Sequence, residues 1–412
     1  MSGVLRKFIV WPLFALVVGV LAWKTAHHLH DPANYSVENG GLLDFHRAVY
    51  AATEFFLEGG NPYGPEYNER DPVGDGYPLF SPAMFVVYAP FGLLPYSVAA
   101  WMFFAFNVGL AFVLAWMILW ICRLPRGPSV LVFTATLLLA SRPGYNNLYL
   151  GQQAFVGTLG TWMALHFARS RPWLGGLGIF LASLKPTFAV PLFIFMLFRR
   201  DFACSFRGLA ISAVGALIPV AIIAFNNDGF VAFFQTVLER YSSDRPGIAE
   251  PGIHYLHIDL ADNLAKFAPL PGGVYGVSLI VLAFGALVLI PTASKSVVRR
   301  ATSPGAAIIM ILILLSIYHS AYDLMLLALP LAAIYFQSEP VWKQLSTPMR
   351  FGLLAMLTIP LLNHLVFKFD EWFPVESMAW KLTTSINCAC MLAALTMFVI
   401  LTFSPTSDKG GS

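Results

Sequence analysis

The chain has 412 residues, of which 58% are hydrophobic and 11% charged, and its mean hydropathy is +0.69. Soluble domains carry about 25% charged residues, so this composition excludes an ordinary soluble enzyme, a disordered chain and a nucleic-acid-binding protein. The net charge of +3 says little about partners, because the positions of the charges matter more than their sum. We expect a single all-α polytopic domain, residues 1–412, embedded in a membrane.

Apolar runs recur along the whole chain, and a helix that crosses lipid satisfies its own backbone hydrogen bonds. The first run follows Arg6 and Lys7 and has no small-residue cleavage site after it, so we expect an uncleaved helix rather than a signal peptide. Counting each run as one crossing predicts about twelve transmembrane helices. The predicted runs are 8–23, 96–122, 129–141, 152–168, 173–184, 187–198, 207–225, 273–292, 303–318, 322–336, 351–366 and 382–403.

Three places in this series depart from simple crossings. Residues 79–122 are almost continuously apolar but are broken by prolines, so we expect a short embedded segment at 79–94 followed by one long crossing. Short runs meet at Lys185 and again at His319. These two positions are predicted to be the tips of helical hairpins that reach the outer face.

The charged connections predict the orientation. Two long connections, 24–78 and 226–272, hold most of the acidic residues, and we place them outside. By the positive-inside rule, the basic connections and both termini lie in the cytoplasm, which makes this a multi-pass protein of the cytoplasmic (inner) membrane. The basic connections are 123–126, 169–171, 199–207, 295–300 and 343–350.

The first outer loop contains an amphipathic pattern. Apolar residues recur at helical spacing over 42–56, and Gly59 to Pro62 ends the pattern. This predicts a helix that lies in the plane of the membrane surface. The second outer loop shows little helical regularity before about 259–267.

Several short motifs occur in order along the chain. They are Asp44-Phe-His-Arg-Ala-Val-Tyr-Ala-Ala, Gly60-Asn-Pro-Tyr63, Tyr77-Pro78, Leu150-Gly-Gln-Gln153, Leu184-Lys-Pro186 and His319-Ser-Ala-Tyr-Asp323. Together they resemble glycosyltransferase family 87, over roughly residues 40–340. That resemblance implies a GT-C fold with interfacial helices in the first outer loop. It also implies an activity like that of the polyprenol-phosphate-mannose-dependent mannosyltransferases or the mycobacterial arabinofuranosyltransferases.

Asp44 is the first candidate catalytic residue. It stands where the family places its essential acid, and a carboxylate there would take the proton of the attacking hydroxyl. The alternative is an acidic residue that only favours the N-terminus of its helix. Lys185 is the candidate for the donor phosphate, because a lysine at membrane depth is costly without a partner. It would otherwise extend to the lipid headgroups. Arg142 and Arg47 are weaker candidates for the same role.

Further residues are assigned to the sugar, the acceptor or proton transfer. His319 is predicted to be catalytic, with a buried packing histidine as the alternative. Polar helix caps are the alternative for the glutamines, and an aromatic belt at the interface is the alternative for the tyrosine of the first loop. The residues assigned to the sugar or acceptor are Arg47, Tyr63, Gln152, Gln153, Tyr322 and Asp323.

The predicted function is inverting transfer of a sugar, most simply mannose, from a polyprenyl-phosphate donor to a membrane-bound glycan or glycolipid acceptor at the outer face. No cofactor is expected. The histidines at 27, 28 and 30 are interpreted as a solvated segment rather than a metal site, and His254 with His257 is interpreted in the same way. Alternatives are a lipid or glycolipid flippase, arabinofuranosyl transfer, or a catalytically inactive subunit of an envelope-polysaccharide complex.

Overall fold

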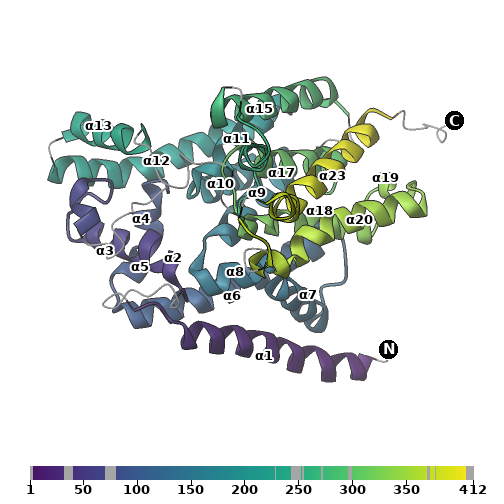
Figure 1. Cartoon of the computed structure of the whole chain (residues 1–412), viewed down its shortest axis with the longest axis horizontal. Coiled ribbons are helices and arrows are strands. Elements are labelled where there is room, and N and C mark those ends of the chain that lie inside the picture. The colour runs from purple at the N-terminus through teal and green to yellow at the C-terminus, as the bar shows by residue number, and fades with distance from the viewer. Residues whose placement is uncertain are drawn as a thin grey trace.

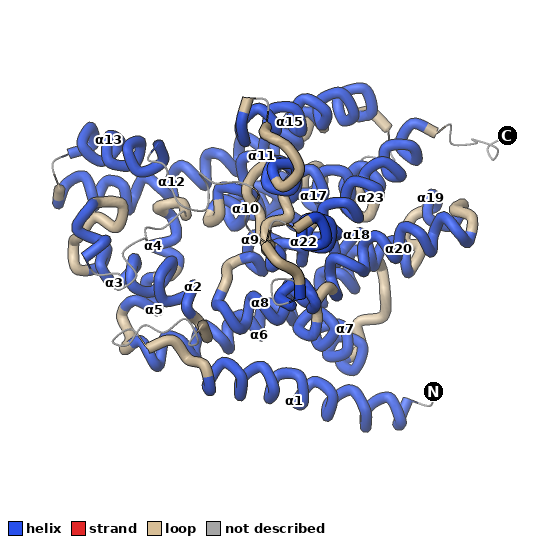
Figure 2. The backbone as a smooth tube through the Cα atoms, in the orientation of Figure 1, coloured by secondary structure: helices blue, strands red, loops and turns tan. Residues whose placement is uncertain are grey.

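The computed structural model describes residues 3–31, 40–69, 80–227, 229–242, 252, 255–270, 272–295, 299–368, 372–375 and 377–404. Within these ranges the structure is helical, with no strand and two isolated β-bridges (Figure 2). The predicted all-α class is confirmed. The predicted Tyr77-Pro78 motif and His254 fall outside the described residues.

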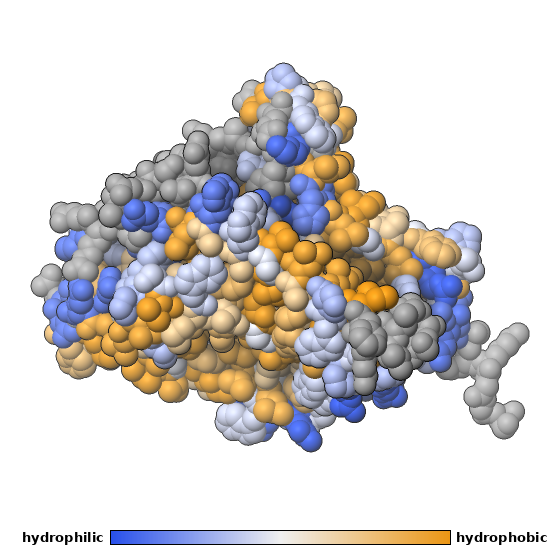
Figure 3. Space-filling model, turned by 90° about the horizontal axis from the view of Figure 1, so that it is seen from below, coloured by the Kyte–Doolittle hydropathy of each residue, from blue (hydrophilic) through white to orange (hydrophobic). Residues whose placement is uncertain are grey.

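Five described helices are long and apolar enough to cross a membrane. They are Ile9–His27, Tyr96–Ile121, Phe202–Asn226, Gly273–Thr292 and Ile386–Phe403. Seven further apolar helices have only 10–17 residues, so the predicted count of about twelve crossings is not confirmed. Large apolar side chains are exposed along these helices, and a broad apolar area covers the face in Figure 3. Such a surface suits contact with lipid rather than water.

The N-terminal third combines one long outer helix with several short ones. Helix α1 (Gly3–His27) runs along the lower edge of the molecule in Figure 1 and packs against α7 (Pro128–Ala140). The predicted amphipathic segment is one helical stretch with a π-helical turn in its middle. Its apolar side is buried, because Leu42, Phe45, Val49, Ala52 and Phe56 are each at most 6% exposed. The stretch consists of α2 (Leu43–Phe45), η1 (His46–Tyr50) and α3 (Ala51–Leu57).

The proline-rich segment divides as predicted into short helices and one long one. Neither α4 (Ala83–Val87) nor α5 (Ala89–Gly92) is long enough to cross a membrane, whereas α6 (Tyr96–Ile121) has 26 residues. The short helix η2 (Pro65–Glu69) precedes this segment.

A hairpin forms around Lys185, as predicted. Helix α9 (Ala154–Phe167) packs closely on α10 (Pro172–Ser183), where a Cβ at Gly160 would lie 2.5 Å from Gly178 O. Helix α11 (Pro186–Phe198) returns along the bundle, and Arg169 Nη2 donates to Arg199 O at 3.0 Å. The start of α10 and the end of α11 therefore lie at the same end of the bundle, with Lys185 at the other end.

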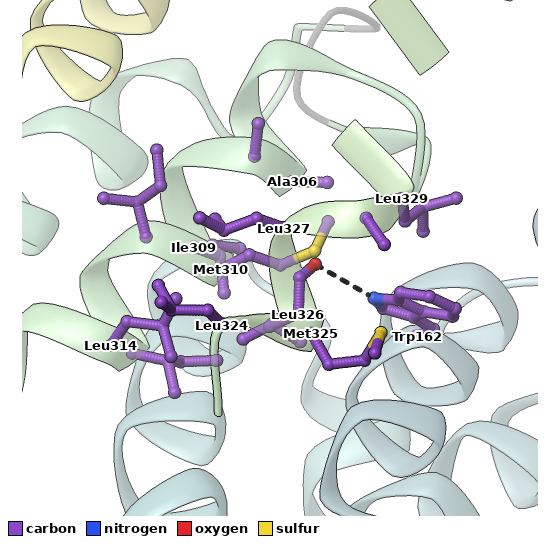
Figure 4. Close-up of a cluster of buried hydrophobic side chains, with 14 of the residues drawn as sticks. Trp162, Ala306, Ile309, Met310, Leu314, Leu324, Met325, Leu326, Leu327 and Leu329 are labelled. Atoms are coloured by element: carbon purple, nitrogen blue, oxygen red, sulfur yellow. Dashed lines mark hydrogen bonds between the residues drawn. The ribbon is translucent and has the colours of Figure 1, made fainter. Parts of the chain in front are cut away.

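Helix α17 (Pro304–Ser316) lies in the centre of the core. All of its 13 residues are buried, and Ser303 caps its N-terminus by accepting a hydrogen bond from Ala306 N. The chain then turns back through η4 (Ala321–Leu327) and α18 (Ala328–Tyr335), which confirms the hairpin predicted at His319. Trp162 Nε1 of α9 donates a hydrogen bond to Leu326 O at 3.3 Å and so links α9 to this hairpin (Figure 4).

The remaining helices complete the bundle. Helix α13 (Gly229–Ser242), with 14 residues, lies in the second outer loop, where little helical regularity is expected from the sequence. Its apolar residues alternate with polar ones at helical spacing, a signal that was present in the sequence. These helices are α8 (Arg142–Asn146), η3 (Asn147–Gly151), α12 (Phe202–Asn226), α13 (Gly229–Ser242), α14 (Leu260–Ala265), α15 (Gly273–Thr292), α19 (Pro340–Lys343), α20 (Thr347–Leu362), η5 (His364–Lys368), α22 (Met378–Thr384) and α23 (Ile386–Phe403).

Candidate active site

A cavity of about 420 Å³ lies where the first loop meets both hairpin tips. Asp44, Gln152, Lys185 and Tyr322 all line it, although they are distant in sequence. Apolar side chains such as Phe80 complete the wall. The structure therefore brings four predicted site residues into one space.

The local backbone fixes the direction of Asp44. Leu42 adopts a left-handed conformation with φ of 58°, and its N–H donates to Tyr149 O at 2.6 Å. Helix α2 begins at Leu43, so Asp44 lies in its first turn. The alternative interpretation, an acidic residue that only favours the helix N-terminus, predicts this position as well. Gly151 (φ 75°) lies against the same turn, and a Cβ there would lie 2.5 Å from Phe45 Cβ. Only glycine allows this close approach.

Gln152 follows this glycine and reaches the carboxylate. Its Nε2 donates to Asp44 Oδ2. Among the described residues, Oδ1 has no hydrogen-bond partner, so one carboxylate oxygen is available to accept a proton from a ligand. Burial raises the pKa of the Asp44 carboxyl, while the Gln152 hydrogen bond and the charges of Arg47 and Lys185 act against that rise.

Lys185, in the cavity wall, forms an ion pair with the buried Asp323 behind it. Its Nζ donates to Asp323 Oδ1 at 2.7 Å and to Oδ2 at 2.8 Å. His319 Nδ1 lies 2.8 Å from Asp323 Oδ2, and its Nε2 lies 3.2 Å from Thr187 O. A carboxylate and a carbonyl only accept hydrogen bonds, so both ring nitrogens of His319 are directed at acceptors of the protein itself.

Lys185 and His319 thus share the single carboxylate of Asp323. Its position is fixed by a capping box, in which Ser320 N donates to Asp323 Oδ2 at 3.2 Å. The ring of Tyr322 separates part of this group from the cavity, with Lys185 Nζ 4.6 Å from the ring centroid. An anion in the cavity would therefore be attracted toward Lys185.

The second outer loop closes the cavity, which the sequence did not indicate. Ile258 N donates to His319 O at 2.9 Å, and Ala321 N donates to Leu256 O at 3.0 Å. This pairing places His257 in the cavity wall, with Nδ1 3.2 Å from Asp262 Oδ1. Tyr255 and Tyr318 also line the cavity.

Little in the sequence indicated that His257 lines the cavity. Its contact partner Asp262 lies in the same loop, whereas the other residues that line the cavity lie elsewhere in the chain. Tyr318 had a stronger signal, since it directly precedes the predicted His319. The pKa of Asp262 is lowered, because hydrogen bonding and charge from His257 outweigh the effect of burial.

Other predicted residues lie outside the cavity lining. His319 and Asp323 are fully buried behind the lining rather than facing the space. Tyr63 is buried and donates to Phe80 O at 2.7 Å, and Gln153 is buried with no hydrogen-bond partner for its amide among the described residues. Arg142 packs on the Tyr145 ring at 5.4 Å. Arg47 is half-buried, and its charge acts on Asp44. Their assignments to donor, sugar or acceptor remain predictions.

The fold and site define a membrane-embedded protein with a half-enclosed cavity that combines a carboxylate, an amide and a lysine. Residues 77–317, more than half of the chain, match the sequence profile of glycosyltransferase family 87. The chain belongs to this family, so the family inferred from the motifs is confirmed. No solved structure gives a significant match.

The similar curated proteins are named alpha-(1->3)-arabinofuranosyltransferase. The protein from Corynebacterium glutamicum is 30% identical over 215 residues, which cover 49% of this chain and 45% of the relative. The protein from Mycobacterium tuberculosis is 24% identical over 204 residues, which cover 48% of this chain and 45% of the relative. The chain thus matches about half the length of these relatives.

Proposed function

We propose that the chain transfers a sugar from a polyprenyl-phosphate donor to a hydroxyl group of a membrane-bound glycan or glycolipid in the Asp44 cavity. The observation that carries this proposal is the shared cavity of Asp44 and Lys185, which puts a proton acceptor and a cation on one reaction space. The membrane helices support a lipid-bound donor, because its tail would remain in the bilayer while the phosphate enters the cavity.

The chemistry is a single displacement with inversion. Asp44 Oδ1 accepts the proton as the acceptor oxygen attacks the anomeric carbon. The bond from that carbon to the phosphate oxygen breaks, and the electron pair leaves with the polyprenyl phosphate. Gln152 holds the carboxylate in place through Oδ2. No metal ion is required for this balance of atoms and charges.

Lys185 stabilises the charge that develops on the leaving phosphate. His319 acts through another residue, because both of its ring nitrogens are directed at protein acceptors and its side chain is fully buried. We therefore assign it a positioning role. It holds Asp323, which in turn fixes the lysine ammonium.

The names of the similar proteins alter the predicted identity of the donor sugar. Mannose was expected from the motifs, but the similar proteins carry arabinofuranosyltransferase names. We therefore propose arabinofuranose as the favoured donor sugar and keep mannose as the competitor. A parallel assay of the two polyprenyl-phosphate sugars with the purified full chain separates them, because the preferred donor gives the higher kcat/KM.

The proposed orientation follows from charge. The connections at the end opposite the Asp44 cavity are rich in arginine, which supports a cytoplasmic position for that end and for both termini. The Asp44 cavity then opens at the outer face. Modification of single introduced cysteines by an impermeant reagent in intact cells tests this orientation.

The test of the proposed base is Asp44→Asn. This change keeps the shape of the side chain but removes the proton acceptor, so we expect turnover to fall about a thousandfold. Glu66→Gln is the matched control, because Glu66 is an exposed acidic residue of the same loop outside the cavity lining. Sugar transfer from radiolabelled lipid donor is measured, with thermal unfolding in detergent as the check on folding.

Two results would contradict the proposal. If folded Asp44→Asn kept near-normal turnover, Asp44 would not be the base. If the wild-type chain transferred no sugar from either donor but moved the lipid across vesicle membranes, the flippase alternative would replace the enzymatic one.

A further inference from the structure

A second cavity, of about 630 Å³, lies at the opposite end of the bundle from Asp44. Helix α9 begins beside Gln152 and ends beside His166 and Arg169, so it connects the two cavities directly. Helix α17 also runs between the two cavities: it begins just after Thr302 of the second cavity and ends just before Tyr318 of the Asp44 cavity. Its 13 residues span about 20 Å, so the second cavity is separate from the candidate active site.

Arginines from three different connections meet at this cavity. Five of its lining residues are arginines, and Glu339 is its one acidic residue. The arginines come from the α6–α7, α9–α10 and α15–α17 connections. They are Arg123, Arg126, Arg169, Arg299 and Arg300.

Among the described residues, two of these arginines have a carboxylate partner. Arg169 pairs with Asp201 at 2.7 Å, and Arg300 pairs with Glu339 at 2.8 Å. Within the described part of the chain, Arg123, Arg126 and Arg299 form no ion pair. The cavity therefore has an excess of positive charge suited to a ligand with at least two negative charges.

Arg123 occupies a backbone position that glycine fits better. Helix α6 ends in a Schellman motif, with Leu124 N donating to Leu119 O at 2.8 Å and Arg123 N donating to Trp120 O at 3.1 Å. Arg123 is the left-handed residue of this motif, with φ of 58°. An arginine costs backbone energy there, but it places a guanidinium at the rim of the cavity.

An aromatic path leads from the lipid-facing surface into the cavity. Trp116 is 41% exposed on α6 and stacks on Trp120 with centroids 5.3 Å apart. Trp120 in turn lies 4.7 Å from the His166 ring, and both line the cavity. An amphipathic molecule fits this surface, with acyl chains along α6 and its anionic head among the arginines.

We propose that this cavity binds the headgroup of an anionic phospholipid with two phosphates, of the cardiolipin type. Guanidinium groups bind phosphate oxygens through paired hydrogen bonds, and three arginines without carboxylate partners match two phosphates. Basic pockets between transmembrane helices bind such headgroups. This site is independent of the proposed sugar transfer.

The test measures lipid binding to the purified full chain in detergent by native mass spectrometry. Cardiolipin, phosphatidylglycerol and phosphatidylcholine are titrated separately. We expect cardiolipin to bind at least about tenfold more tightly than phosphatidylcholine, with phosphatidylglycerol in between. Arg126→Ala should weaken cardiolipin binding roughly tenfold, the value of one charge-assisted hydrogen bond, and leave phosphatidylcholine binding unchanged. A double Arg123→Ala/Arg299→Ala variant should weaken it further.

The matched control is Arg350→Ala, in the first turns of α20 and outside the cavity lining, which should leave cardiolipin binding unchanged. Equal binding of cardiolipin and phosphatidylcholine would overturn the proposal, and so would an equal loss in the Arg350→Ala control. Inorganic pyrophosphate is added as a competitor. If pyrophosphate bound as tightly as cardiolipin and displaced it, the site would be one for free diphosphate rather than for lipid. Each variant's unfolding temperature is recorded, so that misfolding is distinguished from lost binding.

Discussion

The two cavities differ in how they hold their charges. At the Asp44 end, Lys185, His319 and Asp323 are 7% exposed or less and bonded to one another. At the other end, Arg169 and Arg300 have side chains that are 38% and 59% exposed, although their carboxylate partners are buried. Buried charges must be paired, because leaving one alone costs several kcal/mol, whereas exposed charges tolerate the loss of a partner.

This difference shows which end is preorganised. A fixed cation facing a low-polarity cavity stabilises developing charge without rearrangement. A ring of exposed guanidinium groups adapts to a headgroup. Substitutions in the buried group of Lys185, Asp323 and His319 and in the exposed arginine pairs therefore test the two ends separately.

The largest effect is expected for Asp323→Asn. This change leaves the buried Lys185 and His319 facing each other without their carboxylate, so the free energy of unfolding should fall by about 3–5 kcal/mol. Sugar transfer per folded molecule should fall as well, since the ammonium loses its fixed position. Chemical unfolding in detergent and single-turnover assays at low temperature measure the two losses separately. Loss of stability with an unchanged rate would exclude Asp323 from positioning Lys185.

A buried pair at the opposite end provides the comparison. Asp201 contacts Arg199, both side chains are 0% exposed, and Arg169 also donates to the carboxylate. Asp201→Asn should lower the free energy of unfolding by about 3 kcal/mol. Sugar transfer per folded molecule should stay near the wild-type rate, because this pair lies beyond the length of α9 from the Asp44 cavity. A large rate loss in the folded variant would contradict the separation of the two ends.

A smaller effect is expected for Gln152→Leu on the pH profile. The Gln152 hydrogen bond lowers the pKa of Asp44 against the rise caused by burial, so its removal raises that pKa further. The base works in its ionised form, and activity is lost as pH falls through the pKa of Asp44. The acid limb of kcat/KM should therefore move to higher pH in Gln152→Leu. An unmoved limb would mean that a group other than Asp44 controls it.

The smallest effect is expected for Arg300→Ala. Its partner Glu339 also accepts from Thr302, and the arginine side chain is largely exposed. The free energy of unfolding should change by about 1 kcal/mol or less. Thermal unfolding compares this variant with Asp201→Asn under the same conditions. Equal losses in the two variants would contradict the distinction between exposed and buried pairs.

Much of the candidate site followed from local sequence. The motifs around Asp44, Lys185 and Gln152 identified three residues that line one cavity, and the short apolar runs predicted both hairpins. Helical spacing also predicted the buried side of the 42–56 segment. The hairpins and the buried side of the 42–56 segment depend on neighbours in the chain, so periodicity and turn residues predicted them, whereas the site residues were identified through the resemblance of their motifs to the family.

Composition and hydropathy by themselves determined that this is a helical membrane protein, and the order of its motifs determined its family. Only the tertiary structure decided that Lys185 shares Asp323 with His319 and that the second outer loop brings His257 to the cavity. It also gathered the scattered arginines around one hollow at the other end. The physical reason is that a periodic pattern reports which face of a helix is buried, whereas pairing between residues far apart in the chain depends on how the helices pack.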